Sequence, residues 1–99
     1  MEKKVIEDLY HIVLDRKNNP LEQSYTCSLF YQGKDTILKK VSEEATEVIL
    51  ASKSMDKEAT VYELADLFYH ILVLMVEDGI EPSDVYKELR RRMNNKQGG

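Results

Sequence analysis

The chain has 99 residues, and its 14 lysines and arginines against 18 aspartates and glutamates give a formal net charge of -4. This length fits one small domain, at the lower limit for burying an adequate core alone. The acidic balance offers no excess of positive charge for phosphate contacts, so we expect no nucleic-acid partner.

Cysteine content and apolar runs bound the cellular setting. Cys27 is the only cysteine, which excludes an internal disulfide and a zinc site built from several cysteines of one chain. We expect it to be a small buried residue. The most apolar run, from Leu67 to Val76, is too short to span a bilayer, and the N-terminal residues MEKKVIEDLY lack the apolar segment of a signal peptide. We therefore expect a cytoplasmic protein without a membrane partner.

Two helical segments are expected in the first third of the chain. Apolar residues recur at helical spacing from Val5 to Val13, and RKNNP at 16–20 ends the pattern. This predicts a first helix of about four turns. Residues 24–33, SYTCSLFYQG, open on a residue suited to capping and close on glycine. They predict a short helix or turn that packs through Leu29 and Phe30.

Two long helices follow. Between about Thr36 and Ser54, apolar residues recur with a helical period in a window that contains no glycine or proline. After the polar break KSMDK, a second long helix is predicted from about Lys57 to Asp78, ending before Gly79. The apolar stripe of the first of these helices consists of Ile37, Val41, Ala45, Val48 and Ile49.

A last helix is predicted in EPSDVYKELRRR, residues 81–92, with Pro82 before its start and Ser83 or Asp84 as its cap. No segment combines the alternation and the turn residues of strands, so the fold class is all-α, a bundle of four to five helices. Within this single domain, 1–99, residues 1–23 are an N-terminal helix and linker, and residues 94–99 are a flexible tail.

The predicted helix at 57–78 is unusual because its apolar residues surround nearly its whole circumference. Such a helix is buried on most sides. Glu63, Asp66 and His70 lie on one narrow polar stripe within it. A chain of 99 residues cannot easily surround this helix, so we infer that protomers assemble as a homodimer across it.

Carboxylates occur in pairs one turn apart on both long helices. On the first, Glu44 projects within about 60° of the apolar stripe, at the core boundary, and Glu47 lies about 60° further round. On the second, Glu63 and Asp66 lie within apolar surface. Gathering four acids without a cation is strongly unfavourable, because burial penalises each charge and like charges raise one another's pKa. A hard divalent cation with oxygen ligands, Mg²⁺, resolves this conflict.

Structural alternatives exist for these acids. Glutamate is a good helix former, so SEEATE alone is most simply a solvated helix face. Glu63 and Asp66 resist this interpretation because buried acids are usually paired. His70 is interpreted as an interior histidine, hydrogen-bonded to a backbone or carboxylate group, that orients an acid rather than ligating a hard cation. Salt bridges would be the alternative for the two acids, and the candidate partners are Lys39, Lys40 and Lys53.

Three segments together resemble a known family. They are SYT...LF..G from Ser24, ILKKVSEEATEVILASK from Ile37 and ELADLFYHILVLM from Glu63. In this order and spacing, the chain closely resembles the phosphoribosyl-ATP pyrophosphohydrolases of histidine biosynthesis from about Ser24 to Arg92. The acidic motifs alone are also similar to the wider MazG-like superfamily of all-α nucleoside triphosphate pyrophosphohydrolases. The family commonly has glycine where this chain has Ser42.

The resemblance implies an assembly of protomers and Mg²⁺-dependent hydrolysis of phosphoribosyl-ATP to phosphoribosyl-AMP and pyrophosphate. Glu43 matches the first glutamate of the family's pair, and we take it as the candidate general base. The metal ligands implied by position are Glu44, Glu47, Glu63 and Asp66. Candidate substrate-binding residues are Ser24, Tyr25, Thr26, Lys39, Lys40, Lys53 and, in one arrangement from the other protomer, Arg91.

Two other functions remain open at this point. A MazG-like house-cleaning pyrophosphohydrolase would use the same carboxylates on canonical or damaged nucleoside triphosphates, and a panel of substrates separates it from the first function. A non-enzymatic helical interaction module would bind a partner protein through its apolar helix and use its acids for solubility. This last function predicts no binding of divalent cations.

Overall fold

The computed structural model describes residues 4–95. These residues form five α-helices and no strand, so the all-α prediction is confirmed. The second of the two predicted long helices, 57–78, has the bounds expected from its sequence. The helices are α1 (Val5–Asn18), α2 (Tyr25–Gln32), α3 (Lys34–Lys53), α4 (Lys57–Asp78) and α5 (Pro82–Asn94).

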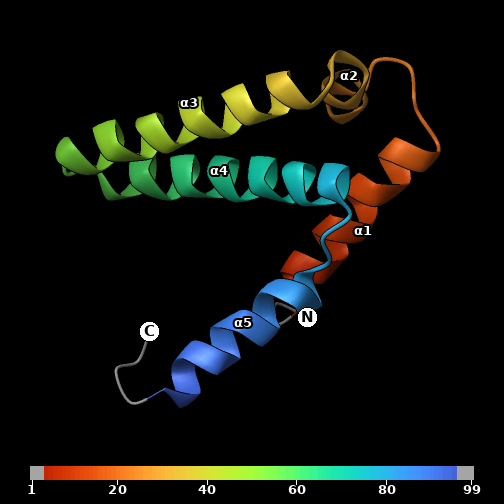
Figure 1. Cartoon of the computed structure of the whole chain (residues 1–99). Coiled ribbons are helices and arrows are strands. Elements are labelled where there is room, and N and C mark those ends of the chain that lie inside the picture. The colour runs from red at the N-terminus through yellow and green to blue at the C-terminus, as the bar shows by residue number, and fades with distance from the viewer. Residues whose placement is uncertain (1–3, 96–99) are drawn as a thin grey trace.

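Helices α3 and α4 form an antiparallel hairpin, and they lie side by side along most of their length (Figure 1). The Asp56 carboxylate caps α4 by accepting a hydrogen bond from the Ala59 amide at 3.1 Å. Gly79 ends α4 in the left-handed conformation, with φ of 71°. Helix α1 packs across the C-terminal half of α4, while α5 extends away from the hairpin (Figure 1).

Helix α2 is fixed at both ends by the residues that predicted it. The Ser24 hydroxyl accepts a hydrogen bond from the Cys27 amide at 3.1 Å and so caps the first turn. Gly33, with φ of 105°, ends α2 and directly precedes α3. Residues with a side chain rarely adopt this backbone conformation. Because one glycine serves both helices, α3 begins at Lys34, slightly earlier than predicted.

The hydrophobic core lies where α1, α2 and α3 meet the C-terminal half of α4. Ile37 and Val73 are completely buried, and Val13 and Leu29 are nearly so. Burial of apolar surface contributes about 25 cal/mol per Å² removed from water, so these contacts dominate the stability of the fold. The predicted packing of α2 through Leu29 is confirmed.

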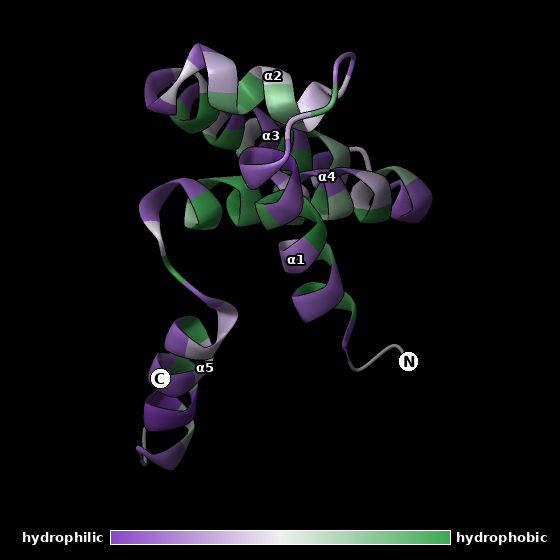
Figure 2. Ribbon diagram, turned by 90° about the vertical axis from the view of Figure 1, so that its right-hand side faces the viewer, coloured by the Kyte–Doolittle hydropathy of each residue, from purple (hydrophilic) through white to green (hydrophobic). Residues whose placement is uncertain are grey.

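One face of α4 is only partly covered in the single chain. Val61, Leu64 and Phe68 are 55%, 36% and 51% exposed, although hydrophobic residues continue along much of the helix (Figure 2). One chain has too few helices to enclose α4, as expected for 99 residues, and burial of α4 by a second protomer stays a prediction. The shape agrees: the radius of gyration is 15.0 Å, compared with about 13 Å for a compact domain of this size.

Helix α4 also corrects the expectation about membrane crossing. By length and composition alone, this helix is long and apolar enough to span a membrane, because it continues beyond the apolar run that was judged too short. Core helices of soluble proteins pass the same test, so the observation is weak and does not by itself indicate a membrane protein.

The start of α5 differs from its prediction. Glu81 occupies the cap position, and the Asp84 carboxylate accepts a hydrogen bond from the Glu81 amide at 2.9 Å. Neither Ser83 nor Asp84 is the cap, because proline is suited to the first helical position and moves the cap one residue earlier. The helix continues to Asn94, and residues 96–99 of the predicted tail lie outside the described residues.

Two further residues are more exposed than expected. Cys27 is half-buried, because its sulfur takes part in hydrogen bonds to the backbone near the surface. Ile49, assigned to the apolar stripe of α3, is 61% exposed. Near its C-terminal end α3 packs mainly against α4, so the far side of the stripe has no helix to cover it within residues 4–95.

Candidate active site

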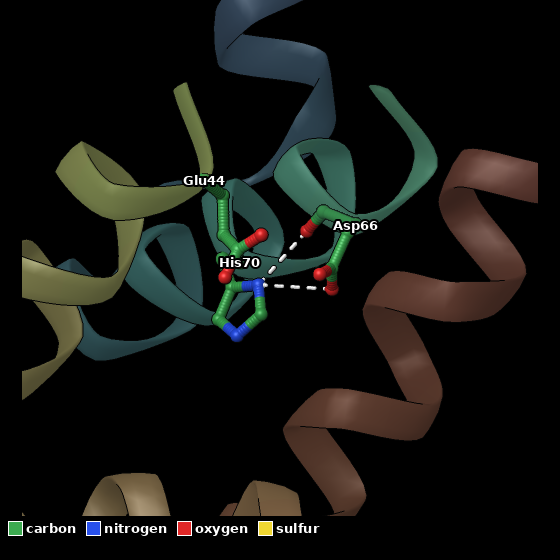
Figure 3. Close-up of side chains that lie close together, drawn as sticks. All are labelled: Glu44, Asp66 and His70. Carbon is green, nitrogen blue, oxygen red and sulfur yellow. Dashed lines mark hydrogen bonds and ion pairs between the residues drawn. The ribbon is translucent and has the colours of Figure 1, made fainter. Parts of the chain in front are cut away.

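Three side chains from the hairpin meet between α3 and α4 (Figure 3). Glu44 comes from α3, and Asp66 and His70 come from adjacent turns of α4; the potential ligand atoms of the three lie within 4.8 Å of one another. Glu44 is only 8% exposed and His70 only 2%. Glu44 therefore lies in the interface with α4, at the core boundary that its helical projection predicted.

The His70 ring is held at both nitrogens. Its Nδ1 lies 2.8 Å from the Asp66 carbonyl oxygen and 3.4 Å from the Asp66 carboxylate, as the dashed lines in Figure 3 mark. A carbonyl oxygen can only accept, so Nδ1 carries a proton and donates it. In the neutral ring, Nε2 then accepts a hydrogen bond from the Tyr25 hydroxyl at 3.0 Å. This confirms the interpretation of His70 as an interior histidine with satisfied hydrogen bonds, although its position alone would allow ligation.

Burial and the neighbouring Asp66 carboxyl disfavour the charged form of Glu44. Burial raises the pKa of the Glu44 carboxyl, the neighbouring Asp66 carboxyl raises it further, and Lys40 and His70 oppose the rise. The site therefore holds converging oxygen ligands whose negative charge Lys40 and His70 offset only in part. This donor set fits a hard divalent cation, which prefers carboxylate oxygens and would remove the repulsion.

Glu47 and Glu63 lie on the adjoining turns of the same helices, on the side nearer the turn that joins α3 to α4. Glu47 is exposed and Glu63 is half-buried. Within residues 4–95, the carboxylate of neither residue makes a hydrogen bond or an ion pair. They are outside the close group formed by Glu44, Asp66 and His70, and their role as ligands stays a prediction. No described lysine pairs with Glu63 or Asp66, so the salt-bridge alternative is wrong.

Lys40 pairs with acids of its own helix. Its Nζ lies 3.5 Å from a Glu43 oxygen and 3.6 Å from a Glu44 oxygen. Glu43 itself is half exposed to solvent, so water can reach the carboxylate that we expect to act as a base. Lys39 and Lys53 are also exposed, and neither makes an ion pair with residues 4–95.

The SYT segment contributes three different contacts. Ser24 caps α2, as the structural alternative for this segment required. Tyr25 is 51% exposed, and its hydroxyl reaches His70. The Thr26 hydroxyl bonds to the Tyr69 hydroxyl on α4. These contacts attach α2 to the helix that carries Asp66, and they leave the predicted substrate roles of the three residues untested.

Sequence reasoning missed Tyr69 and the pairing of Tyr25 with His70. Burial raises the pKa of the Tyr69 hydroxyl, as expected for a phenol enclosed between helices. Contacts between α2 and α4 join residues far apart in the sequence and leave no local signal. The one available sign was that His70 lies on the polar stripe of an apolar helix.

Arg91 is placed differently from the other candidates. It lies on α5, which extends away from the hairpin, and its guanidinium donates two hydrogen bonds to the Glu88 carboxylate at 3.0 and 2.7 Å (Figure 1). The structure therefore does not bring Arg91 to the carboxylates of the candidate active site in its own chain. The predicted contact with substrate requires a second protomer.

Comparison with known proteins identifies the family. A family model described as phosphoribosyl-ATP pyrophosphohydrolase matches residues 6–93. The chain belongs to this pyrophosphohydrolase family. The resemblance seen from Ser24 to Arg92 is thus confirmed, and the match extends through α1 as well.

Individual members of the pyrophosphohydrolase family are similar over most of the chain. The phosphoribosyl-ATP pyrophosphatase of Sulfurisphaera tokodaii is 53% identical over 93 residues, covering 94% of this chain and 99% of that protein. That of Geobacter sulfurreducens is 56% identical over 88 residues, covering 89% and 82%. The histidine biosynthesis bifunctional protein HisIE of Thermoanaerobacter pseudethanolicus is 53% identical over 85 residues, which are 86% of this chain but 39% of that longer protein.

Proposed function

We propose that this chain hydrolyses phosphoribosyl-ATP to phosphoribosyl-AMP and pyrophosphate, the second step of histidine biosynthesis. One observation carries the proposal: in a member of the pyrophosphohydrolase family, Glu44 and Asp66 converge from two helices with ligand oxygens within 4.8 Å. Relatives named phosphoribosyl-ATP pyrophosphatase, about half identical to this chain, support the choice of substrate.

The acids of the hairpin would hold Mg²⁺. Glu44 and Asp66 are the nearest ligands, and Glu47 and Glu63 on the adjoining turns complete the proposed set. A divalent cation held by these acids would neutralise negative charge on a triphosphate and polarise its phosphoanhydride. The raised pKa of Glu44 supports this role, because the buried carboxyl needs a positive partner in order to ionise.

The remaining groups of the site handle the proton and the phosphate charge. The oxygen of a water molecule forms a bond to phosphorus at the α–β phosphoanhydride as the bridging P–O bond breaks, and pyrophosphate leaves. The half-exposed Glu43 carboxylate accepts the proton that this water loses. The Lys40 ammonium group, which lies 3.5 Å from a Glu43 oxygen and 3.6 Å from a Glu44 oxygen, is available to phosphate oxygens. Lys39 and Lys53 are exposed residues of the same helix, and we assign them the same role toward phosphate charge.

We also propose a homodimer that buries the exposed face of α4. Val61, Leu64 and Phe68 form this face, and their exposure of 36% to 55% leaves a large apolar surface on the single chain. A partner there would also allow Arg91 to reach substrate held by the other protomer. Sedimentation analysis tests this assembly, and a chain that remains monomeric at high concentration contradicts it. We further propose that residues 1–99 form a single catalytic domain and that the protein is located in the cytoplasm.

Two substitutions test the metal ligands. Glu47→Ala and Asp66→Ala should each abolish hydrolysis of phosphoribosyl-ATP and weaken Mg²⁺ binding in titration calorimetry, while circular dichroism shows unchanged helix content. Lys87→Ala, an exposed position on α5, serves as the matched control. Full turnover by either acid variant at saturating Mg²⁺ would contradict the assigned role, and wild-type protein that binds no divalent cation would favour the interaction module.

A panel of nucleotides tests the substrate. Phosphoribosyl-ATP, ATP and the deoxynucleoside triphosphates are compared in the presence of Mg²⁺, with pyrophosphate release as the measurement. We expect phosphoribosyl-ATP to have the highest kcat/KM. Rapid turnover of deoxynucleoside triphosphates without turnover of phosphoribosyl-ATP would replace the proposal with the house-cleaning function.

A further inference from the structure

An open groove lies between the end of α1 and helix α2. Its volume is about 860 Å³, which is within the range of clefts that bind small ligands. The walls include two cations and three aromatic rings. They are Arg16, Lys17, Tyr25, Phe30 and Tyr31.

The walls of this groove are fixed to each other. The Cys27 sulfur accepts a hydrogen bond from the Leu21 amide and donates one to the Arg16 carbonyl, each at 3.3 Å. These bonds join the end of α1, the connecting loop and the first turn of α2. The groove therefore exists before any ligand binds.

One residue of the groove also contacts the candidate active site. Tyr25 lines the groove, and its hydroxyl lies 3.0 Å from His70 Nε2. The other nitrogen of His70 donates to the Asp66 carbonyl at 2.8 Å. Through Tyr25 and His70, two hydrogen bonds therefore link the lining of the groove to Asp66.

The lining suits an aromatic and anionic group. Tyr31 is 93% exposed, so its ring is accessible for stacking on a planar base. The Tyr25 ring is 51% exposed and already stacks on Tyr69, with ring centroids 6.3 Å apart. Lys17 already lies over the Phe30 ring, at 5.5 Å from its centroid, and pairs with Glu77 at 3.5 Å. The Arg16 guanidinium makes one ion pair, with the adjacent Asp15 at 3.3 Å, and keeps other N–H groups available.

We propose that this groove binds the purine and the phosphoribosyl group attached to it, with Tyr31 stacking on the base and Arg16 pairing with the phosphate of that group. The inference rests on the proposed function and deepens it, because it names the residues that distinguish phosphoribosyl-ATP from a plain nucleoside triphosphate. Glu22 is the one acidic residue of the lining, so the groove carries more positive than negative side chains.

Binding of two product-like probes tests the groove without turnover. Phosphoribosyl-AMP and AMP are titrated into wild-type protein and into Arg16→Gln and Tyr31→Ala. Arg16→Gln should weaken phosphoribosyl-AMP about tenfold and leave AMP within about twofold, whereas Tyr31→Ala should weaken both about tenfold. Arg16→Lys should restore most of the lost affinity. Lys87→Gln and Met55→Ala, which remove an exposed cation and an exposed apolar side chain elsewhere, should bind both probes like wild type.

Kinetics separate this inference from the proposed function. Both groove variants should raise KM for phosphoribosyl-ATP about tenfold with kcat and Mg²⁺ affinity unchanged. Variants that bind both probes like wild type, or that lose kcat at unchanged KM, overturn the groove while hydrolysis by the wild-type protein leaves the function intact. Wild-type protein that shows the expected probe affinities without hydrolysing phosphoribosyl-ATP overturns the function instead.

Discussion

Replacing Glu44 by glutamine should change the stability of the protein in opposite directions with and without divalent cation. Without a cation, the buried Glu44 carboxylate is close to that of Asp66, and burial together with this neighbour raises the pKa of Glu44. Glutamine has nearly the same shape but no charge, so the repulsion disappears. With a cation bound, the same substitution removes a ligand.

The magnitude follows from the geometry. The ligand oxygens of Glu44 and Asp66 lie within 4.8 Å of each other, and two unit charges at that limit repel by about 3.5 kcal/mol at an effective dielectric constant of about 20. Asp66 is 34% exposed, so solvent screening lowers this to about 1–2 kcal/mol. The lost pairing with Lys40 at 3.6 Å costs about 0.5 kcal/mol. Cation-free Glu44→Gln should therefore be more stable than wild type by about 1 kcal/mol, which raises Tm by about 4–8 °C in a domain of this size.

Thermal unfolding followed by circular dichroism measures both effects, at one protein concentration, in EDTA and in excess Mg²⁺. Mg²⁺ at about 100 times its Kd stabilises wild type by about 2.7 kcal/mol, so the order of the two Tm values should reverse. Glu58→Gln, an exposed glutamate on α4, is the matched control and should not change the response to Mg²⁺. A Glu44→Gln protein that is less stable in EDTA and keeps the full Mg²⁺ response would refute the reasoning.

The pH dependence of the cation-free protein has a definite sign. Because the pKa of Glu44 is raised in the folded state, folding favours the protonated carboxyl. The stabilisation that the protonated Glu44 carboxyl gives is fully present below the pKa of this group in the unfolded chain. It is lost as pH rises through the higher pKa of this group in the folded protein. The free energy of unfolding of wild type should fall over that window relative to Glu44→Gln, and parallel pH profiles for the two proteins would contradict the assigned environment.

Two further substitutions test local structure. Ser24→Ala removes the hydroxyl that accepts from the Cys27 amide, so urea unfolding should show a loss of about 1 kcal/mol, while Ser24→Asn should keep the cap; equal stability of Ser24→Ala and wild type would contradict this. On α5, Arg91 and then Arg92 lower the pKa of the Glu88 carboxyl to about 2. The stability from these pairs is present above the ordinary pKa of glutamate and lost as pH falls through about 2. An NMR titration of the Glu88 carboxyl should show this midpoint, Arg91→Gln should raise it, and an ordinary midpoint in wild type would rule out the pairing.

Helix positions were largely predictable because their signals are local. Ser24 caps α2 through its own hydroxyl, and Gly79 ends α4 because it adopts a left-handed conformation. The start of α5 was misassigned by a few residues because serine, aspartate and glutamate near a proline can all serve as caps. The bounds of α4 followed from the polar break before it and the glycine after it.

The site was predictable only in part. Helical projection put Glu44 at the core boundary, and the apolar surroundings of Asp66 indicated that it needed a partner across the helix interface. The contacts of Tyr25 with His70 and the groove beyond it depend on how α2 and α1 pack, which no local pattern encodes. The exposed face of α4 shows the same limit, since a sequence gives the apolarity of a helix but not what covers it.

Gly33 has a consequence for the reaction although it touches none of the reacting groups. A methyl group added at this position would meet no atom within 4 Å, so the obstacle to any other residue is the φ of 105° and not crowding. The backbone conformation of Gly33 sets the angle between α2 and α3, and hence where the Tyr25 hydroxyl lies relative to His70. A change at Gly33 would therefore shift α2 and Tyr25 relative to His70, while the carboxylates of the α3–α4 hairpin stay in place.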